Sequence, residues 1–513
     1  MGVVAMTWSV GLVGVVGHPV RVEVDVSAGL PATTVVGLPD AAVVEARDRI
    51  RAAVLNSGHG WPMRRITVSL TPASVRKHGS GFDLALAVAV LAGAGAVPLG
   101  GLTDTAFVAE LGLDGRVRGV RGVLPAVLAA ARAGLRTVVV ARDNLREADA
   151  VPGVVALGAT HLTDVVKMLR GERSAVVSAA EEGPAGAGGQ PPVSSGGDLS
   201  EVVGQPVGRR AAEVAAAGGH HLMLVGPPGA GKTMLGARIP GLLPDLTDAQ
   251  ALEVTAVHSV AEVLDEASGL VRRPPLQDPH HTATVGAMVG AGSSDLRPGA
   301  ASLAHHGVLL LDEAPEFPVA VLQALRQPLE TGEVVVMRAR SRVRFPARFQ
   351  MVLTANPCPC ASPSGDQVCS CPASLRRRYL ARLSGPLLDR VDLRVRLGPL
   401  TRAALYDGLE FSEPSAVVRH RVAAARAAAG ERWRGYGYEC NAEVPGSLLR
   451  GQGMPPRRAL LPLERALDRG DLSVRGFDRV LRVAWTVADL AGVSAPELAH
   501  VSEALELRGE VVT

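Results

Sequence analysis

Hydrophobic and polar residues alternate along the first part of the chain as half-buried β-strands require. Residues 20–26 place a valine at every second position, and residues 66–70 form a second run of this kind. Residues 40–55 can form an apolar stripe at helical spacing, and residues 82–92 are rich in Ala, Val and Leu, which predicts a buried helix. These elements predict a compact mixed domain over residues 1–170.

The pattern changes after residue 170. Residues 171–198 are small, polar and rich in Gly and Pro, with too little apolar surface to order themselves, and therefore predict a flexible linker. We place a second domain at residues 199–400 and a third at residues 401–513. Four helical patterns dominate the third domain, and the last two are typical of a helical lid; the patterns cover residues 417–429, 457–469, 474–490 and 495–507.

A loop between a predicted strand and a predicted helix carries the clearest chemistry in the chain. Residues 221–225 predict the buried strand and residues 234–239 the helix. The loop between them consists of Gly226, Pro227, Pro228, Gly229, Ala230, Gly231, Lys232 and Thr233. Its glycines let backbone N–H groups point inward at phosphate oxygens, and the helix adds its positive N-terminal end. This context predicts a P-loop that binds a nucleotide.

Within this P-loop, Lys232 is expected to contact the outer phosphates of ATP, and the Thr233 hydroxyl is expected to hold Mg²⁺. The chain contains only three lysines, Lys77, Lys167 and Lys232, and almost all other positive charge is arginine. A slender ammonium fits between phosphates better than the wide guanidinium fork does. The alternative, a flexible Gly/Pro loop with a stray lysine, is disfavoured by the flanking strand and helix.

Polar side chains follow two further apolar runs. Asp312 and Glu313 directly follow the run at residues 308–311, and Asn356 directly follows the run at residues 349–355. Ligands bind at the carboxyl ends of parallel strands, so we expect Asp312 in the Mg²⁺ shell and Glu313 beside the attacking water. The Asn356 side chain could bridge that water and the terminal phosphate. An apolar run ending in Asp-Glu is commonly just a strand end, but the upstream P-loop favours the catalytic interpretation.

Composition narrows the class of protein. The chain has 513 residues, enough for about three domains. Its 53 basic and 50 acidic residues leave a net charge of +3, too mild to indicate a nucleic-acid binder, so any such surface must be local. No apolar segment is long enough to span a bilayer, and the first 20 residues lack the features of a secretion signal. We expect a cytoplasmic protein that does not enter membranes.

Four of the five cysteines lie in the loop at residues 356–372: Cys358, Cys360, Cys369 and Cys371. Four thiolates from one short loop can close a tetrahedral Zn²⁺ site, which would order a segment too polar to fold by itself. Free buried thiols and a redox pair are the alternatives. Histidines occur in adjacent pairs, such as His220 and His221, for which packing and backbone hydrogen bonds are favoured over metal binding.

Residues 334–345 predict a β-hairpin with arginines around its tip, at Arg338, Arg340, Arg342 and Arg344. In a ring of subunits, one such hairpin from each could line the pore and contact DNA phosphates. Arg376, Arg377 and Arg378 add charge to the same domain. The alternative is a solvated sheet edge whose charges prevent aggregation.

The P-loop, the Asp-Glu strand and the Asn-tipped strand together resemble an AAA+ ATPase. Residues 226–235, 305–317, 354–360 and 384–393 are similar to the magnesium-chelatase-like YifB/ComM family, in the helix-2-insert branch of AAA+ proteins. The similarity covers essentially the whole chain. It implies a homo-oligomeric, hexameric ring and an α/β fold: a Lon-protease-like (ribosomal S5 domain 2-like) α+β domain, an AAA+ core with a parallel sheet, and a helical lid.

The AAA+ resemblance also implies roles for arginines. Hydrolysis in such proteins usually needs an arginine from the next subunit, and Arg390 is the best candidate, with Arg378 second. Arg475, at the start of a predicted lid helix, is placed to act as a second sensor. For any one arginine in a chain this rich in them, a surface charge is the alternative.

Residues 8–170 resemble the Lon-protease-like domain of this family, a fold shared with Ser-Lys peptidases. The peptidase serine falls at Gly81 and the lysine at Leu124, so both catalytic residues are missing. Ser80 is adjacent to Gly81, but no lysine follows in the second matching segment. Lys77 is an implausible substitute, because a general base must reach the serine hydroxyl that it deprotonates. We expect a non-proteolytic domain for assembly or partner binding.

The resemblance implies a role in DNA processing, with branch migration the sharpest assignment. The leading hypothesis is therefore an ATP-hydrolysing ring that acts on DNA, by branch migration or helicase-type translocation. A chelatase-type or chaperone-like ATPase that remodels protein is the alternative. An ATP-dependent peptidase is a third hypothesis, and the missing Ser-Lys pair argues against it.

Overall fold

The computed structural model describes residues 4–37, 41–72, 79–172, 175–179, 197–264, 269–292, 296–338, 341–361, 369–383, 385–400 and 412–509. Two compact units make up the chain. The first comprises Met1–Pro191, Asp248–Val271 and Met337–Phe345, and the second comprises Pro192–Thr247, Arg272–Val336 and Pro346–Thr513. Two short stretches that the sequence places in the second domain thus cluster with the first unit. Among the described residues, none of the helices is sufficiently long and apolar to cross a membrane.

The first unit is built on an eight-stranded mixed sheet with the order β10-β9-β8-β5-β1-β2-β4-β3. Its strands are β1 (Val4–Val13), β2 (Val16–Ser27), β3 (Ala32–Val36), β4 (Arg65–Thr71), β5 (Thr105–Val108), β8 (Thr137–Ala141), β9 (Val155–Ala159) and β10 (Val177–Ser178). β1, β2 and β4 pair antiparallel, whereas β1, β5, β8 and β9 pair parallel. β10 extends the sheet beyond residue 170, the expected end of the first domain. A separate ribbon pairs β6 (Glu110–Leu111) with β7 (Val117–Arg118).

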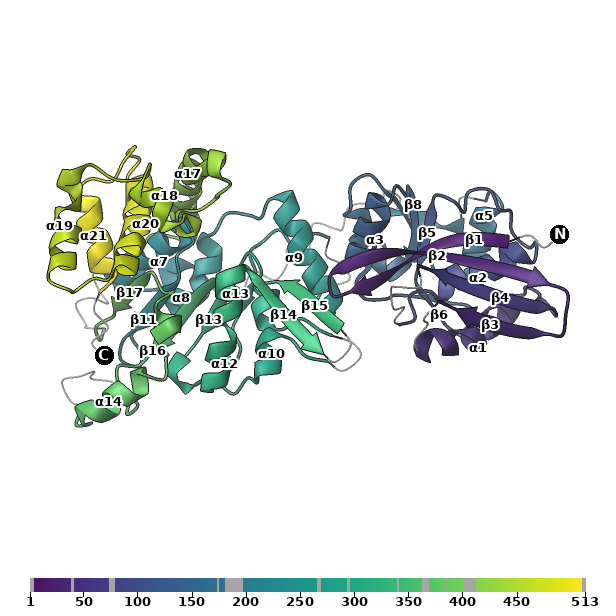
Figure 1. Ribbon diagram of the computed structural model, residues 1–513, viewed down its shortest axis with the longest axis horizontal. Helices are drawn as coiled ribbons and strands as arrows, with labels where there is room; N and C mark the ends of the chain where they lie inside the picture. Colours follow the sequence, from purple (N-terminus) through teal and green to yellow (C-terminus); the bar gives the residue numbers. More distant parts are fainter. Residues whose placement is uncertain are drawn as a thin grey trace. The chain divides into compact units, whose positions relative to one another are not determined.

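Both faces of this sheet are covered, because successive side chains of a strand point to opposite sides. Val139 of β8 belongs to the core beneath α1 (Ala41–Asn56), α2 (Asp83–Gly93) and α5 (Leu162–Leu169). Val138 and Val140 belong to the core beneath α3 (Val123–Arg132) and α4 (Leu145–Asp149). Ala256 of α9 (Asp248–Ala261) joins this second core, which explains why that stretch clusters with the first unit. Figure 1 shows α1, α2, α3 and α5 in purple to blue and α9 in teal.

The second unit contains a five-stranded sheet with the order β12-β13-β16-β11-β17, and all its pairings are parallel. Its strands are β11 (Leu222–Val225), β12 (Leu276–Gln277), β13 (Val308–Leu311), β16 (Gln350–Ala355) and β17 (Leu393–Arg396). β11, β13 and β16 are buried at every position, as parallel strands covered on both faces should be. β16 lies between β11 and β13, so the carboxyl ends of these three strands are neighbours.

Helices complete the second unit. α7 (Pro206–Gly218) and α8 (Lys232–Leu242) pack with the sheet in one core, and the C-terminal helices share that core. The C-terminal helices are α17 (Ser415–Trp433), α18 (Gly446–Arg450), α19 (Arg457–Asp468), α20 (Val474–Leu490) and α21 (Leu498–Leu507), drawn in yellow-green and yellow in Figure 1. α20 begins where its cap dictates, because the Ser473 hydroxyl accepts a hydrogen bond from the Gly476 N–H.

The predicted fold class is confirmed: a mixed α+β sheet domain, a parallel α/β domain carrying the P-loop, and C-terminal helices. Helix α20 has the limits predicted from its periodicity, residues 474–490. The domain boundaries themselves stay predictions.

Candidate active site

The P-loop connects the end of β11 to the start of α8. Gly229 and Gly231 have φ angles of +77° and +81°, in the left-handed region that favours glycine. Gly226 must also be glycine, since a Cβ there would lie 2.8 Å from the Leu397 carbonyl oxygen. The chain therefore turns sharply into α8, whose N-terminal N–H groups follow the loop directly. This is the local geometry that binds phosphate.

Lys232 is the first residue of α8, and its side chain lies within the loop, where the residue is only 8% exposed. Its Nζ donates to the carbonyl oxygens of Gly226 and Pro227, each at 2.8 Å, and to Asn356 Oδ1 at 3.0 Å. Burial lowers the pKa of Lys232, an effect opposed by the carboxylates of Asp312 and Glu313. The ammonium is thus held among oxygen atoms, the same partners that phosphates would offer, so the residues fit a nucleotide.

A single buried hydroxyl contacts both acidic residues after β13, through the carboxylate of Asp312 and the backbone of Glu313. Thr354 Oγ1 donates to Asp312 Oδ1 at 2.5 Å and accepts from the Glu313 N–H at 3.0 Å. Glu313 has a φ of +51°, which is unusual for a residue with a side chain. Asp312 Oδ1 also accepts from Thr233 Oγ1 at 2.9 Å. Oxygen ligands of this kind suit Mg²⁺, so Thr233 and Asp312 form a fitting site for it.

The structure therefore brings together most of the residues expected at the site. The P-loop, Asp312, Glu313 and Asn356 meet at the carboxyl ends of β11, β13 and β16, where ligands bind in parallel sheets. Sequence reasoning missed Thr354. The signal in the sequence was a single hydroxyl between apolar neighbours, two residues before Asn356. The structure shows that this hydroxyl-bearing residue is fully buried.

Arg390 and Arg475 lie elsewhere in the second unit. Among the described residues, the Arg390 side chain contacts the Pro386 carbonyl oxygen, at 2.5 Å, and the Glu330 carboxylate. Arg475 is 85% exposed and lies 3.9 Å from Asp389. Burial and the charges of neighbouring arginines, Arg475 among them, lower the pKa of Arg390. Arg378, on α14 (Ala373–Leu380), is exposed.

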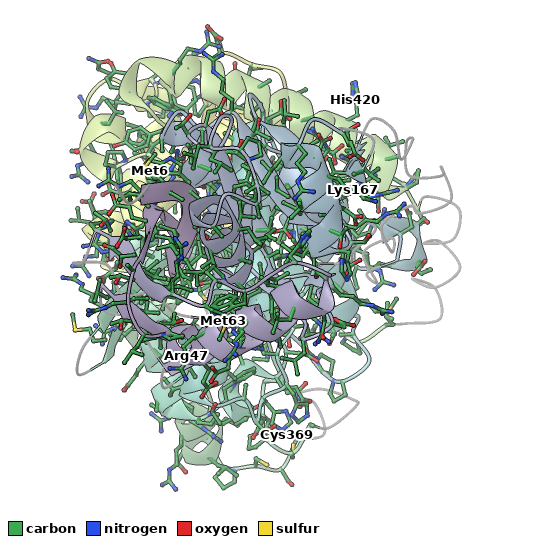
Figure 2. The ribbon with its side chains drawn as sticks, turned by 90° about the vertical axis from the view of Figure 1, so that its right-hand side faces the viewer. Met6, Arg47, Met63, Lys167, Cys369 and His420 are labelled. Atoms are coloured by element: carbon green, nitrogen blue, oxygen red, sulfur yellow. The ribbon has the colours of Figure 1, made fainter. Side chains whose placement is uncertain are left out.

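The four clustered cysteines come together although residues 362–368 of their loop lie outside the described residues. Their Sγ atoms all lie within 4.8 Å of one another. Cys369 Sγ, labelled in Figure 2, is 3.4 Å from Cys358 Sγ and 3.6 Å from Cys360 Sγ. Four sulfurs bound to one Zn²⁺ at about 2.3 Å would lie about 3.8 Å apart. The donor set and spacing fit zinc.

Burial and the neighbouring thiols raise the pKa of Cys358 to about 12. Without a metal, a thiol in this environment resists ionisation, so a bound cation would have to displace its proton.

The predicted hairpin is present as β14 (Glu333–Arg338) paired with β15 (Ser341–Pro346). Arg342 and Arg344 are exposed and alternate with the buried Val343 and Phe345. The two arginines therefore share one solvent-facing side. Arg340 lies outside the described residues, as does the side chain of Arg338.

In the first unit, the residues at the peptidase-like positions make other contacts. The Ser80 hydroxyl donates to the Glu110 carboxylate. Leu124 is fully buried in the core beneath α3, and its N–H donates to Glu147 Oε1 at 2.7 Å. Asp83, two residues after Gly81, is fully buried and bonded to Arg49 through both carboxylate oxygens, at 2.8 and 3.1 Å.

Three family descriptions match the chain. Residues 198–405 match "Magnesium chelatase, subunit ChlI", residues 22–144 match "Subunit ChlI of Mg-chelatase", and residues 412–508 match "Magnesium chelatase, subunit ChlI C-terminal". Among individual relatives, the chain is 52% identical to an uncharacterized protein of Mycobacterium tuberculosis over 503 residues, which is 98% of both chains.

It is also 40% identical to the competence protein ComM of Haemophilus influenzae, over 99% of this chain and 98% of that one. A 27% identity to the magnesium-chelatase 38 kDa subunit of Rhodobacter capsulatus covers 55% of this chain and 77% of that one. With the strand order and the P-loop geometry, these similarities show that the chain belongs to the YifB/ComM family of magnesium-chelatase-like AAA+ proteins.

Proposed function

We propose that this protein is a ring-forming ATPase whose hydrolysis of ATP drives movement on DNA. One observation carries the ATPase part: the P-loop lysine, the Asp312–Glu313 pair and Asn356 converge at three adjacent strand ends. The family assignment supports ATP and Mg²⁺ as ligands of this site and an oligomer as the working form.

Each side chain then has a distinct task. Lys232 binds the outer phosphates, exchanging loop carbonyl oxygens for phosphate oxygens. Thr233 and Asp312 hold Mg²⁺, which when bound neutralises phosphate charge. Glu313, exposed at the end of β13, accepts a proton from the attacking water, an effect worth about 10²- to 10⁴-fold in rate. Asn356 orients the attacking water toward the terminal phosphate.

The charge that develops on the phosphate needs a further cation, and we assign this task to Arg390 of a neighbouring subunit. Arg390 contacts Glu330 and Pro386 within its own chain and stands among other arginines, which suits a residue presented at a subunit interface. Arg475, largely exposed at the start of α20, senses the nucleotide from the lid. A hexameric ring would complete six such sites.

DNA is the substrate that the hairpin favours. Arg342 and Arg344 face solvent from one side of a two-stranded element, where they could contact phosphates without reading sequence. The name of the Haemophilus influenzae relative, a competence protein, points in the same direction. The magnesium-chelatase relative favours the alternative, in which the ring remodels a protein.

We further propose that Cys358, Cys360, Cys369 and Cys371 hold a structural Zn²⁺. Their four sulfurs are spaced for tetrahedral coordination, and all four positions would be filled by protein, as structural sites require. The site follows Asn356 closely in the chain, so its role would be to hold the loop that connects Asn356 to α14.

The experiment is steady-state ATPase measurement with the full-length protein, alone and with single-stranded, duplex, forked and four-way DNA. Lys232→Ala is the matched control for contaminating activity. We expect stimulation of about tenfold or more by at least one branched DNA. ATP hydrolysis that no DNA stimulates would remove DNA from the proposal and favour protein remodelling. No hydrolysis above the Lys232→Ala control would overturn the ATPase itself.

A further inference from the structure

A buried chain of polar side chains connects the lid helix α20 to the parallel sheet. His220, just before β11, lies with Nδ1 3.3 Å from Asp392 Oδ2 and Nε2 2.7 Å from Thr486 Oγ1. Asp392 immediately precedes β17, and Thr486 is on α20. Arg479, also on α20, donates from Nη1 to Asp392 Oδ1 at 2.6 Å. The lid helix therefore reaches the Asp392 carboxylate at the edge of the sheet in two ways, directly through Arg479 and through His220 from Thr486.

The order hydroxyl–imidazole–carboxylate looks like a hydrolytic triad, but burial rules out that use. His220 and Thr486 are fully buried, and Asp392 is 3% exposed, so no substrate carbonyl could reach the hydroxyl. Thr486 Oγ1 is also occupied by Asn441 Nδ2 at 3.1 Å. This group is a connection between lid and sheet.

The charge of Asp392 keeps the connection together. Burial alone would raise its pKa, but the hydrogen bond from His220 and the positive charge of Arg479 hold the pKa of Asp392 well below its usual range. Asp392 thus stays ionised and needs its cationic partner, because a buried carboxylate without one is costly.

Arg479 has a second contact that extends this connection to Arg390, the proposed interface arginine. The same Nη1 donates to the backbone carbonyl oxygen of Arg390 at 3.1 Å. Arg475 lies four residues earlier on α20, so both arginines share one face of the helix. The backbone that carries Arg390 is therefore held by the lid helix that carries Arg475.

We infer that Arg479 is a positioning residue for Arg390: it transmits the pose of the lid to the arginine that a subunit offers to its neighbour's nucleotide. This inference rests on the proposed function. It makes Arg479 important for hydrolysis at the neighbouring site although it touches neither nucleotide nor water. Misplacing a catalytic group by about 1 Å can lower a rate about 100-fold.

The first test compares Arg479→Met with Arg482→Met in the full-length protein. Arg482 is a matched control, because its Nε donates to the Val444 carbonyl oxygen at 2.7 Å from the same helix. We expect Arg479→Met to lower kcat about 10- to 100-fold with KM for ATP within about threefold, since ground-state binding is untouched. Arg482→Met should leave kcat within about threefold. Equal loss in both variants would reduce Arg479 to a general stabiliser of the helix.

Arg479→Lys provides a variant that retains a positive charge should the methionine variant fold poorly. Both hydrogen bonds leave the single nitrogen Nη1, and the shorter lysine side chain can place its ammonium there only in part, so an intermediate kcat is expected. If Arg479→Lys behaves like wild type while Arg390→Ala is inactive, positioning through the Arg390 carbonyl is wrong.

The second test mixes subunits before assembly and measures ATPase activity. Glu313→Gln subunits lack the base but carry an intact Arg390, whereas Arg479→Met subunits retain the base. At junctions between the two, hydrolysis should reappear above the sum of the separate proteins. The Arg390→Ala and Glu313→Gln mixture is the reference. Recovery there without recovery for Arg479→Met overturns this inference alone, and full activity of Arg390→Ala by itself overturns the proposed interface arginine.

Discussion

The hydroxyl of Thr354 offers a test of how the Asp312 carboxylate and the Glu313 backbone are held. Replacing Thr354 with Val preserves the shape of a fully buried side chain while removing both of its hydrogen bonds, to Asp312 Oδ1 and from the Glu313 N–H. A bond to a charged group is worth about 1.5–3 kcal/mol, and a backbone N–H left without a partner costs about 1–3 kcal/mol. Asp312 is partly exposed and can recover some hydration, so we expect Thr354→Val to lower the free energy of unfolding by about 2–4 kcal/mol.

The effect on hydrolysis should be larger than the effect on folding. Glu313 has a left-handed backbone that its N–H bond to Thr354 helps to fix. Released from that bond, its carboxylate would relax away from the water, and a shift of about 1 Å predicts a kcat loss of about 100-fold. Nucleotide affinity should change less, because the loop around Lys232 is untouched.

Thr354→Ser is the control, since it keeps the hydroxyl and deletes only a buried methyl group, at a cost of about 1 kcal/mol. Urea unfolding followed by tryptophan fluorescence gives the stability, and steady-state ATPase gives kcat. Wild-type kcat in Thr354→Val would refute the reasoning. So would equal losses in the Val and Ser variants, because the methyl group, not the hydroxyl, would then matter.

Three other predictions concern pH, metal and DNA. His221 Nδ1 accepts a hydrogen bond from the Met351 N–H at 3.0 Å, and burial lowers the pKa of His221 from 6.5 to about 4. The stability that the neutral histidine contributes is therefore complete above its unfolded pKa. It is lost as the pH falls toward 4, by about 2 kcal/mol at about pH 5. His221→Asn keeps the acceptor and should flatten urea stability between pH 7 and 5; an unchanged slope contradicts the assignment. Purified protein should contain about one Zn²⁺ per chain by elemental analysis, and Cys371→Ser should lose most of it; wild-type zinc content in that variant would exclude this thiol. Replacing Arg342 and Arg344 with Gln should reduce the salt dependence of DNA binding, a log–log slope, by about one to two; an unaltered slope would place the DNA elsewhere.

Local pattern and motif spacing predicted much of this molecule. Helix α20 follows directly from apolar residues at helical spacing, and the P-loop follows from glycines between a strand and a helix. The convergence of Asp312 and Asn356 on Lys232 could be expected because parallel strands end on one side of a sheet. Each of these inferences needs only one segment and a general rule about its neighbours.

Contacts between residues that are distant in the sequence could not be predicted from the sequence. The residues of β16 do not reveal that this strand lies between β11 and β13. An apolar run indicates that a strand is buried, but it does not indicate which strands pair with it. The clustering of α9 with the first unit depends on a surface formed by α3, more than 100 residues away. Arg479 looks like any other arginine of an amphipathic helix until the fold brings Asp392 beneath it.

The enclosed amine of Lys232 also makes this chain unusually simple to probe chemically. Lys167 is exposed on α5, as labelled in Figure 2, while Lys232 is 8% exposed and surrounded by oxygen atoms. Among the lysines of the described residues, an acylating reagent therefore meets one accessible amine, Lys167, and one shielded amine, Lys232; Lys77 lies outside those residues. Mass spectrometry of acylated protein can follow occupancy of the phosphate loop at a single residue, using Lys167 as the internal standard. In a lysine-rich relative, that signal would be lost among dozens of modified side chains.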